Sequence, residues 1–367
     1  MKDTLTLLKN TSSLWDKLKV EKPRVVLYGM GDGAVKLLNI LENLGVKCYG
    51  IFASDDFVRY QSFMGFTVKK LTDIEEEIED FVVLSAFATR LESVIENFYN
   101  ISKRHPFFVP DINVSGDYLE LFDNAFVSRF SDRIEKVYFS LDDVGKEFYK
   151  ALILYKFTGE LTYLEKIEEL RCSSPPPFDC EKVTSFADFG AYIGDTILEA
   201  KSLYPNLSEA VGYEPDEKNF KKLVLNTENI GIPVTSFNCL VLDRECEIPL
   251  LSGGAMNTII LDNVLMVNNL QKKKERKVKA VTGDGTLPFV PNLIKMDVEG
   301  CERAALDGCF KTIRDSSPIL KVSIYHNHRD VFEIFEKISE INNSYKYTIR
   351  QKCRYIPAWD IELIAKP

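Results

Sequence analysis

The chain has 367 residues, of which 45% are hydrophobic and 28% charged, and its formal net charge is -9. This length exceeds one domain of roughly 150 residues, so we expect two domains. The composition is that of an ordinary globular protein and argues against a disordered or membrane protein. The acidic balance argues against a nucleic-acid partner, because binding to the phosphate backbone depends on concentrated lysine and arginine.

Residues 1–20 place a charged or polar side chain every few positions, so they lack the apolar core of a signal peptide. No later stretch resembles a membrane span, and we expect a cytoplasmic protein. The eight cysteines are scattered without a Cys-x-x-Cys pair. This spacing argues against a zinc or redox motif and for reduced, structural thiols.

Residues 1–113 predict a first α/β domain, in which short apolar runs alternate with helical stretches. Alternation of this kind is typical of a parallel sheet with helices on its faces. We expect strands at 25–29, 46–56, 66–71, 80–87 and 106–114, with helices at 34–45 and 89–103.

The turn after the first of these strands is rich in glycine. Gly29, Gly31 and Ala34 fit a Gly-x-Gly-x-x-Gly/Ala pattern between a strand and a helix. Asp55 ends the second strand, where an acid that binds a ribose belongs. The region resembles the Rossmann-like modules that precede sugar-modifying enzymes. Gly29, Gly31, Gly33 and Asp55 are therefore candidates for a second nucleotide site that binds NAD(P) or another nucleotide; the alternative is an empty, structural or dimerising module, which would give a homodimer.

Residues 114–182 predict a helical connector between the domains. Aromatic residues and leucines recur at helical spacing from Asp142 to Leu170. The run Pro175–Pro177 cannot continue a helix, so it marks the clearest boundary in the chain.

Residues 183–367 resume the alternation and predict a second doubly wound, mostly parallel sheet. The fold class is therefore α/β with two such sheets. We expect the basic run Lys272–Lys277 to be a solvated loop, and the last two strands to form a hairpin. The expected strands are 184–190, 210–215, 233–241, 257–263, 277–283, 292–300, 318–326, 345–353 and 360–367, and the expected helices are 195–204, 217–231, 301–315 and 331–341.

The stretch FADFGAYIGDT contains the turn that matters most, because ligands of open parallel sheets bind beyond the carboxyl ends of the strands. Gly190 lets the backbone approach a ligand, and Gly194 lets the next helix start tightly. The spacing Asp-x-Gly-x-x-x-Gly fits a nucleoside thioether better than a pyrophosphate, and Glu214 ends the next strand as a ribose acid. We therefore expect S-adenosylmethionine as cofactor. Its candidate binding residues are Asp188, Gly190, Ala191, Gly194, Asp195, Thr196, Glu214 and Asp297.

Four ordered motifs, FADFGAYIGDT, GYEPDEKNFKKLVLN, LIKMDVEGCERAALDGC and PILKVSIYH, resemble those of FkbM-type S-adenosylmethionine-dependent methyltransferases. The resemblance covers about half the chain, roughly residues 184–367, and implies a class I methyltransferase fold. It also implies methyl transfer to a hydroxyl of a sugar, polyketide or related small molecule. By this likeness Asp188, Gly190 and Gly194 line the cofactor turn and Glu214 holds the ribose.

The candidate catalytic residues are His326, Asp297 and Glu299. Strand alternation places both acids on one side together with Lys295, a structural partner for buried carboxylates. A sugar hydroxyl is weakly acidic and benefits from a general base, and His326 titrates near neutrality. The alternatives are a salt-bridged strand end with a surface histidine, or a divalent metal held by the two acids, His326 and His328; we expect no metal.

The sequence thus predicts an O-methyltransferase that acts on a sugar hydroxyl of a glycan or glycosylated small molecule. Two alternatives stay open. One is a non-catalytic nucleotide-sensing or scaffold protein, and the other is a bifunctional protein whose first half binds NAD(P). Binding of S-adenosylmethionine separates the enzyme from the scaffold.

Overall fold

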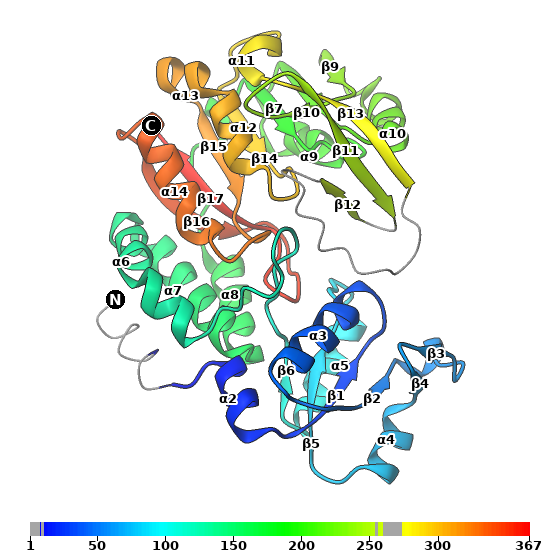
Figure 1. Ribbon diagram of the computed structural model, residues 1–367. Coiled ribbons are helices and arrows are strands. Elements are labelled where there is room, and N and C mark those ends of the chain that lie inside the picture. The colour runs from blue at the N-terminus through cyan, green and yellow to red at the C-terminus, as the bar shows by residue number, and fades with distance from the viewer. Residues whose placement is uncertain (1–7, 9–10, 254–255, 260–273) are drawn as a thin grey trace.

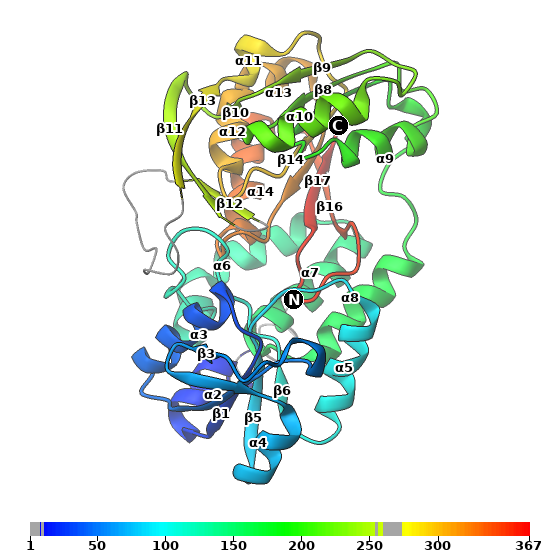
Figure 2. The ribbon, with the colours of Figure 1, turned by 90° about the vertical axis from the view of Figure 1, so that its right-hand side faces the viewer.

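The computed structural model describes residues 8, 11–253, 256–259 and 274–367. Two sheets lie at opposite ends of the molecule, with a group of helices beside the junction between them (Figures 1 and 2). Among the described residues, no helix has the length and apolar character needed to cross a membrane.

The first sheet has the strand order β3-β4-β2-β1-β5-β6, and its neighbours are parallel except for the β3–β4 pair. This confirms a mostly parallel, doubly wound first sheet. The short strand β3 and the helices α2 and α4 were not predicted. The bounds are α2 Leu14–Glu21, β1 Arg24–Tyr28, α3 Asp32–Asn43, β2 Cys48–Phe52, β3 Ser62–Phe63, β4 Phe66–Lys69, α4 Leu71–Glu77, β5 Phe81–Ser85, α5 Glu92–Ser102 and β6 Phe107–Phe108.

Three helices follow: α6 (Asn124–Ser140), α7 (Asp143–Thr158) and α8 (Leu161–Ser173). The predicted helical stretch is divided because Gly159 adopts φ 67° and ends α7 with a left-handed cap. Helix α7 is buried along most of its length, and Asp142 caps its start. Its Gly145 lets the helix approach β16 closely, since an added Cβ would lie 3.0 Å from the backbone of Thr348.

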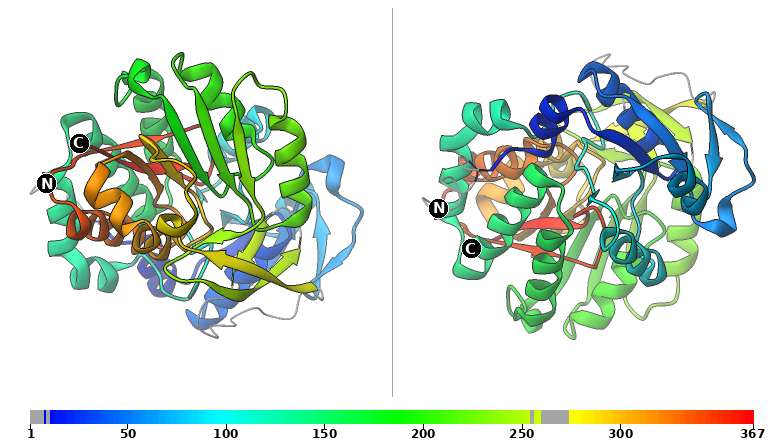
Figure 3. Two further views of the ribbon diagram at one scale, coloured as in Figure 1. Left: turned by 90° about the horizontal axis from the view of Figure 1, so that it is seen from above. Right: turned by 90° about the horizontal axis from the view of Figure 1, so that it is seen from below.

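The second sheet has the strand order β16-β17-β15-β14-β7-β8-β9. All of its strands are parallel except β17, which forms the predicted hairpin with β16. Helices cover both of its faces (Figure 3). The bounds are β7 Ser185–Phe189, α9 Asp195–Leu203, β8 Glu209–Tyr213, α10 Glu217–Thr227, β9 Val234–Phe237, β14 Leu293–Met296, α12 Glu302–Gly308, α13 Phe310–Ser316, β15 Ile319–Ser323, α14 Asp330–Ile341, β16 Lys346–Gln351 and β17 Ile361–Lys366.

A four-stranded sheet of order β10-β13-β11-β12 is inserted between β9 and β14, and the sequence did not predict it. Its strands are β10 Leu240–Val241, β11 Cys246–Gly253, β12 Met256–Ile259 and β13 Lys274–Val281, and α11 (Gly283–Thr286) follows. The predicted strand 233–241 is divided between two sheets. The predicted loop Lys272–Lys277 is wrong from Lys274 onward, because these residues pair with β11; residues 272–273 and the end of the predicted strand 257–263 lie outside the described residues.

The strand order of the second sheet reverses at β7, which lies between β8 and β14. Ligands of open α/β sheets bind at such a switch point, beyond the carboxyl ends of the strands. Because Asp188 of β7 is in register with Lys295 of β14, the residues that follow both strands meet at this place.

Candidate active site

The turn after β7 contains two glycines in the left-handed conformation. Gly190 has φ 83° and Gly194 has φ 84°. The N–H of Gly190 donates to the carbonyl of Tyr213 at 3.0 Å. A Cβ on Gly190 would overlap the carbonyl oxygen of Asp297, so the turn presses against the residue that follows β14. Only glycine meets both demands, and its lack of a side chain leaves the backbone open to a ligand.

A buried ion pair joins β7 to β14 beneath this turn. Lys295 Nζ lies 3.1 Å from Asp188 Oδ1 and 3.8 Å from Asp297 Oδ2. Burial by itself lowers the pKa of Lys295, but the two carboxylates raise it above its ordinary value. Asp188 Oδ2 is buried and has no hydrogen-bond partner within the described part of the chain. Lys295 is therefore the structural partner of these acids.

Glu214 follows β8 and is only 5% exposed. Its Oε2 accepts from the N–H of Tyr192 at 2.9 Å, and its Oε1 accepts from the N–H of Asp216 at 2.8 Å. Burial raises the pKa of Glu214 to about 7, although both N–H groups oppose the rise. Each carboxylate oxygen keeps a second lone pair, so Glu214 is fixed against the glycine turn and can still accept from a ligand.

The other three residues expected at the cofactor turn also lie here. Ala191 is buried, and its N–H donates to the carbonyl of Tyr213 at 2.9 Å. Asp195 is exposed in the first turn of α9, and Thr196 Oγ1 accepts from Lys352 Nζ at 3.3 Å. The structure thus brings all the expected cofactor residues to one end of the sheet.

His326 follows β15 and is fully buried beside three carboxylates. Its Nδ1 lies 3.0 Å from Glu302 Oε1, and its Nε2 lies 3.6 Å from both Asp297 Oδ1 and Glu299 Oε2. The side chains of Asp297 and Glu299 are 27% and 35% exposed, whereas that of His326 is 1% exposed. The two acids therefore face outward, and the imidazole lies behind them.

The charges of this cluster follow from that arrangement. Burial opposes a charge on His326, but Glu302, Glu299 and Asp297 raise its pKa to about 10. Burial raises the pKa of Glu299 to about 7, while His326 opposes the rise. Near neutral pH the imidazole is protonated and Glu299 is partly ionised. The role of His326 as the base stays a prediction, and Glu299 is the more accessible proton acceptor.

Two partners of the cluster were missed from the sequence. Glu302 accepts from the N–H groups of Val298 and Gly300 at 2.9 and 3.3 Å in addition to facing the imidazole. Tyr325 donates its hydroxyl to Asp297 Oδ1 at 3.1 Å. The sequence signal that could have identified them is their position, since Tyr325 directly precedes His326 and Glu302 closely follows Asp297 and Glu299.

His328 does not join this cluster. Its Nδ1 lies 3.1 Å from Asp111 Oδ2, so the alternative metal site that includes His328 is wrong. Of the described residues, Asp297, Glu302 and His326 offer ligand atoms within 4.8 Å of one another. However, His326 faces Glu302 with Nδ1 and Asp297 with Nε2. The imidazole therefore bridges the two carboxylates, whereas in a chelate both carboxylates would lie beside the same nitrogen.

The glycine turn of the first sheet keeps the backbone geometry of a nucleotide fold. Gly29 and Gly31 have φ of 109° and 143°, and a Cβ on Gly33 would overlap the backbone that follows β5. The side chain of Asp55, however, is 71% exposed and lies 3.6 Å from Lys70 Nζ. This turn therefore lacks the buried acid of the second one, and its geometry gives no support to NAD(P).

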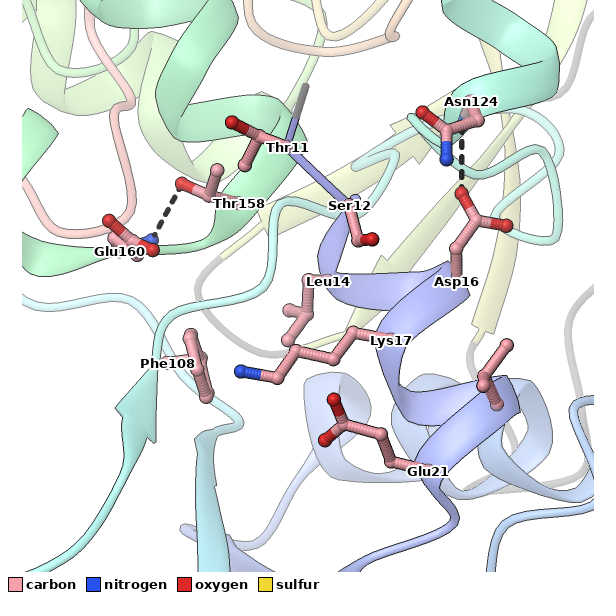
Figure 4. A pocket seen from close by; sticks show the side chains of 11 residues that line it. Thr11, Ser12, Leu14, Asp16, Lys17, Glu21, Phe108, Asn124, Thr158 and Glu160 are labelled. Carbon is pink, nitrogen blue, oxygen red and sulfur yellow. Dashed lines mark hydrogen bonds between the residues drawn. The ribbon is translucent and has the colours of Figure 1, made fainter. Parts of the chain in front are cut away.

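A cavity of about 530 Å³ lies elsewhere, between α2, β6 and the helices of the connector (Figure 4). Its polar groups partly satisfy one another: Asp16 Oδ2 accepts from the N–H of Asn124 at 3.0 Å, and Thr158 Oγ1 accepts from the N–H of Glu160 at 3.3 Å. The residues that line it include no histidine, so the cluster beyond β14 and β15 is the better candidate site.

Comparison with solved structures shows a fold shared over nearly the whole chain. A methyltransferase FkbM from Methylobacillus flagellatus KT matches with a TM-score of 0.68 and 17% identity, over 96% of this chain and 92% of that one. A ribosomal protein L11 methylase from Lactobacillus delbrueckii subsp. bulgaricus matches with a TM-score of only 0.28 and 12% identity, over 56% and 77% of the two chains. Human N-acetylserotonin methyltransferase, solved in complex with SAM, gives 0.29 and 8%, over 74% and 66%.

A search of curated protein sequences finds no match. Residues 188–355 match the model of the methyltransferase FkbM domain, and this range runs from the buried acid of β7 to the loop between β16 and β17. The match places the FkbM-type methyltransferase domain at residues 188–355, and the Methylobacillus protein shares the fold.

Proposed function

We propose that this methyltransferase uses S-adenosylmethionine to methylate a hydroxyl of a sugar, on a glycan or a glycosylated small molecule. The observation that carries the proposal is the adjacency of two features at the switch point. The glycine turn presses on Asp297, and Asp297 and Glu299 lie 3.6 Å from the imidazole of His326.

The residues present fit this cofactor. Glu214 keeps lone pairs for the two hydroxyls of a ribose, and the orphaned Asp188 Oδ2 can accept from a ligand donor. Acidic side chains suit a ligand with a positive sulfonium and a positive amino group. When bound, S-adenosylmethionine supplies a methyl group that is already electrophilic.

The protein must align the acceptor oxygen and remove its proton. Glu299 is the outermost group of the cluster, and its pKa of about 7 suits a general base near neutral pH. Glu299 would take the proton of the acceptor hydroxyl, and the cofactor would give its methyl group to that oxygen and leave as S-adenosylhomocysteine once its methyl–sulfur bond is broken. Asp297 accepts a hydrogen bond from Tyr325, which holds its carboxylate in place, and the protonated His326 offsets part of the charge of both acids.

Aromatic rings beside the acids support a sugar acceptor. The rings of Tyr325 and Trp359 are stacked at 6.2 Å, and Tyr355 lies 5.5 Å from Trp359. All three side chains are half-buried. An aromatic face is electron-rich and attracts the polarised C–H groups of a sugar ring, while carboxylates bind its hydroxyls.

The test is calorimetric titration with S-adenosylhomocysteine, followed by transfer of a labelled methyl group to a panel of sugars, glycosides and polyphenols. We expect binding by the native protein, none by a Glu214→Ala variant, and label in the sugars. No binding by folded native protein would favour the scaffold alternative. If the labelled methyl group appeared only in polyphenols, the sugar acceptor would be wrong, but methyltransferase activity would stand.

A further inference from the structure

The segment that leads from β6 to α6 lies on the turn after β15. The N–H groups of Val114 and Ser115 both donate to the carbonyl of His326, at 2.8 and 3.2 Å. Asn113 Oδ1 accepts from the N–H of His328 at 2.7 Å. The segment therefore holds the backbone of this turn at two points.

The same segment contacts the turn that carries Glu299. A Cβ on Gly300 would overlap Ser115 Oγ, and this hydroxyl accepts from Asn327 Nδ2 at 3.1 Å. Ser115 thus lies between the turn after β14 and the turn after β15. The separation of Glu299 from His326 depends on a segment that precedes both by much of the chain.

The segment is also held from the side of the first sheet. Lys36 Nζ, on α3, donates to the carbonyls of Asn113 and Val114 at 3.2 and 3.1 Å. Asn113 is 3% exposed, and its Nδ2 donates to the carbonyl of Asp117 at 2.7 Å. Both ends of this buried amide are therefore used, and a buried amide that loses a partner leaves a costly unsatisfied group.

We propose that the segment 113–117 belongs to the methyltransferase site, and that Asn113 is a positioning residue that sets His326 against Glu299 and Asp297. The segment that leaves the first sheet after β6 thus supplies part of the active site. The inference rests on the proposed function, because only that function assigns a role in methyl transfer to His326, Glu299 and Asp297.

The experiment uses the imidazole NMR signals of the full chain, which has only three histidines. The signals are assigned with single His→Gln variants. Asn113→Ala is compared with Asn124→Ala, an exposed asparagine at the start of α6. His105 serves as an internal reference, since it pairs with Glu75 of α4.

We expect Asn113→Ala to shift the His326 and His328 signals, to leave His105 in place, and to change affinity for S-adenosylhomocysteine less than about twofold, because the cofactor turn is not touched. Turnover should fall about 10- to 100-fold, as expected for a misplaced catalytic group. Asn124→Ala should change none of these quantities.

If Asn113→Ala does not fold, Lys36→Met removes the two bonds to the segment from outside and should shift His326 in the same sense. A His326 signal that stays in place in the folded variants would overturn the positioning role. Failure of the native chain to bind S-adenosylhomocysteine would overturn the proposed function instead, and that result is read independently of the histidine signals.

Discussion

The two glycine turns of this chain both join a strand to a helix but lie in different surroundings. At both, a strand passes into a helix through residues with positive φ. In the second sheet the turn presses on Asp297 and its acid, Glu214, is 5% exposed. In the first sheet the corresponding Asp55 has a side chain that is 71% exposed.

This difference shows which feature separates the sheet of the candidate active site from the first sheet. Glycines only open the backbone to a ligand. Strong electrostatic interactions also require ionisable groups that are buried away from water, because charges interact more strongly in the protein interior. The second sheet has them in Asp188, Lys295, Glu214 and His326, all at most 6% exposed.

The largest expected effect concerns the buried ion pair. Lys295→Met leaves Asp188 without its partner, and removal of one member of a buried pair costs about 3–5 kcal/mol of unfolding free energy. The counterpart in the first sheet is Lys70→Met, beside the exposed Asp55, which should cost at most about 1 kcal/mol. Urea denaturation measures both. Equal losses of unfolding free energy in the two variants would contradict the difference between the two sheets. Adding Asp188→Asn to Lys295→Met should restore part of the stability.

The second expectation concerns pH and Glu214. Its folded pKa of about 7 lies above the ordinary 4.5, so the folded state binds more protons between these values. Stability from this group is therefore full below pH 4.5 and is lost as the pH rises through 7, by about 3 kcal/mol at most. Glu214→Gln should flatten the change, as measured by urea denaturation at pH 5 and 8.

The third expectation concerns the glycines themselves. Gly190→Val forces a side chain into the carbonyl of Asp297 and should weaken binding of S-adenosylhomocysteine by about 100-fold, or ~3 kcal/mol. Gly31→Val is the matched change, because a Cβ there meets nothing within 4 Å, although its φ is also positive. Calorimetry should show unchanged affinity for Gly31→Val. Weakened binding in both variants would mean that the two turns act together.

The smallest expected effect is on the chemical step. Glu299→Gln keeps the shape of the side chain but removes the base, so turnover with the sugar found in the acceptor screen should fall about 10- to 100-fold at unchanged cofactor affinity. Native turnover should rise as the pH passes through about 7, where Glu299 loses its proton. An unaltered pH profile in Glu299→Gln would assign the proton to another group.

The sequence predicted both parallel sheets, the final hairpin and the meeting of Asp188, Gly190 and Asp297, because these depend on local periodicity and on the rule for strand ends. The prediction failed where the structure depends on pairing between strands that are distant in the sequence. The charged strand β13 exists because β11 lies beside it. The predicted strand 106–114 ends at Phe108, since Pro110 cannot donate to a ladder, and the rest of it forms the segment on His326.

The candidate site was predictable in composition but not in charge state. Asp297, Glu299 and His326 were chosen from strand ends alone. Glu302 and Tyr325 entered only with the structure, because the direction of a side chain on a turn does not follow from spacing. The raised pKa of His326 follows from the charges of three carboxylates around it, which outweigh the opposing effect of its burial and which no single motif encodes.

The packing of α7 on β16 has a consequence for the synthesis of the chain. The helix is buried along most of its length, and Thr348 of β16 donates to Asp142 at its start. Yet β16 lies far along the chain, after nearly all of the second sheet. A ribosome therefore releases α7 well before its partner strand, so the helix can complete its packing only after β16 has been synthesised.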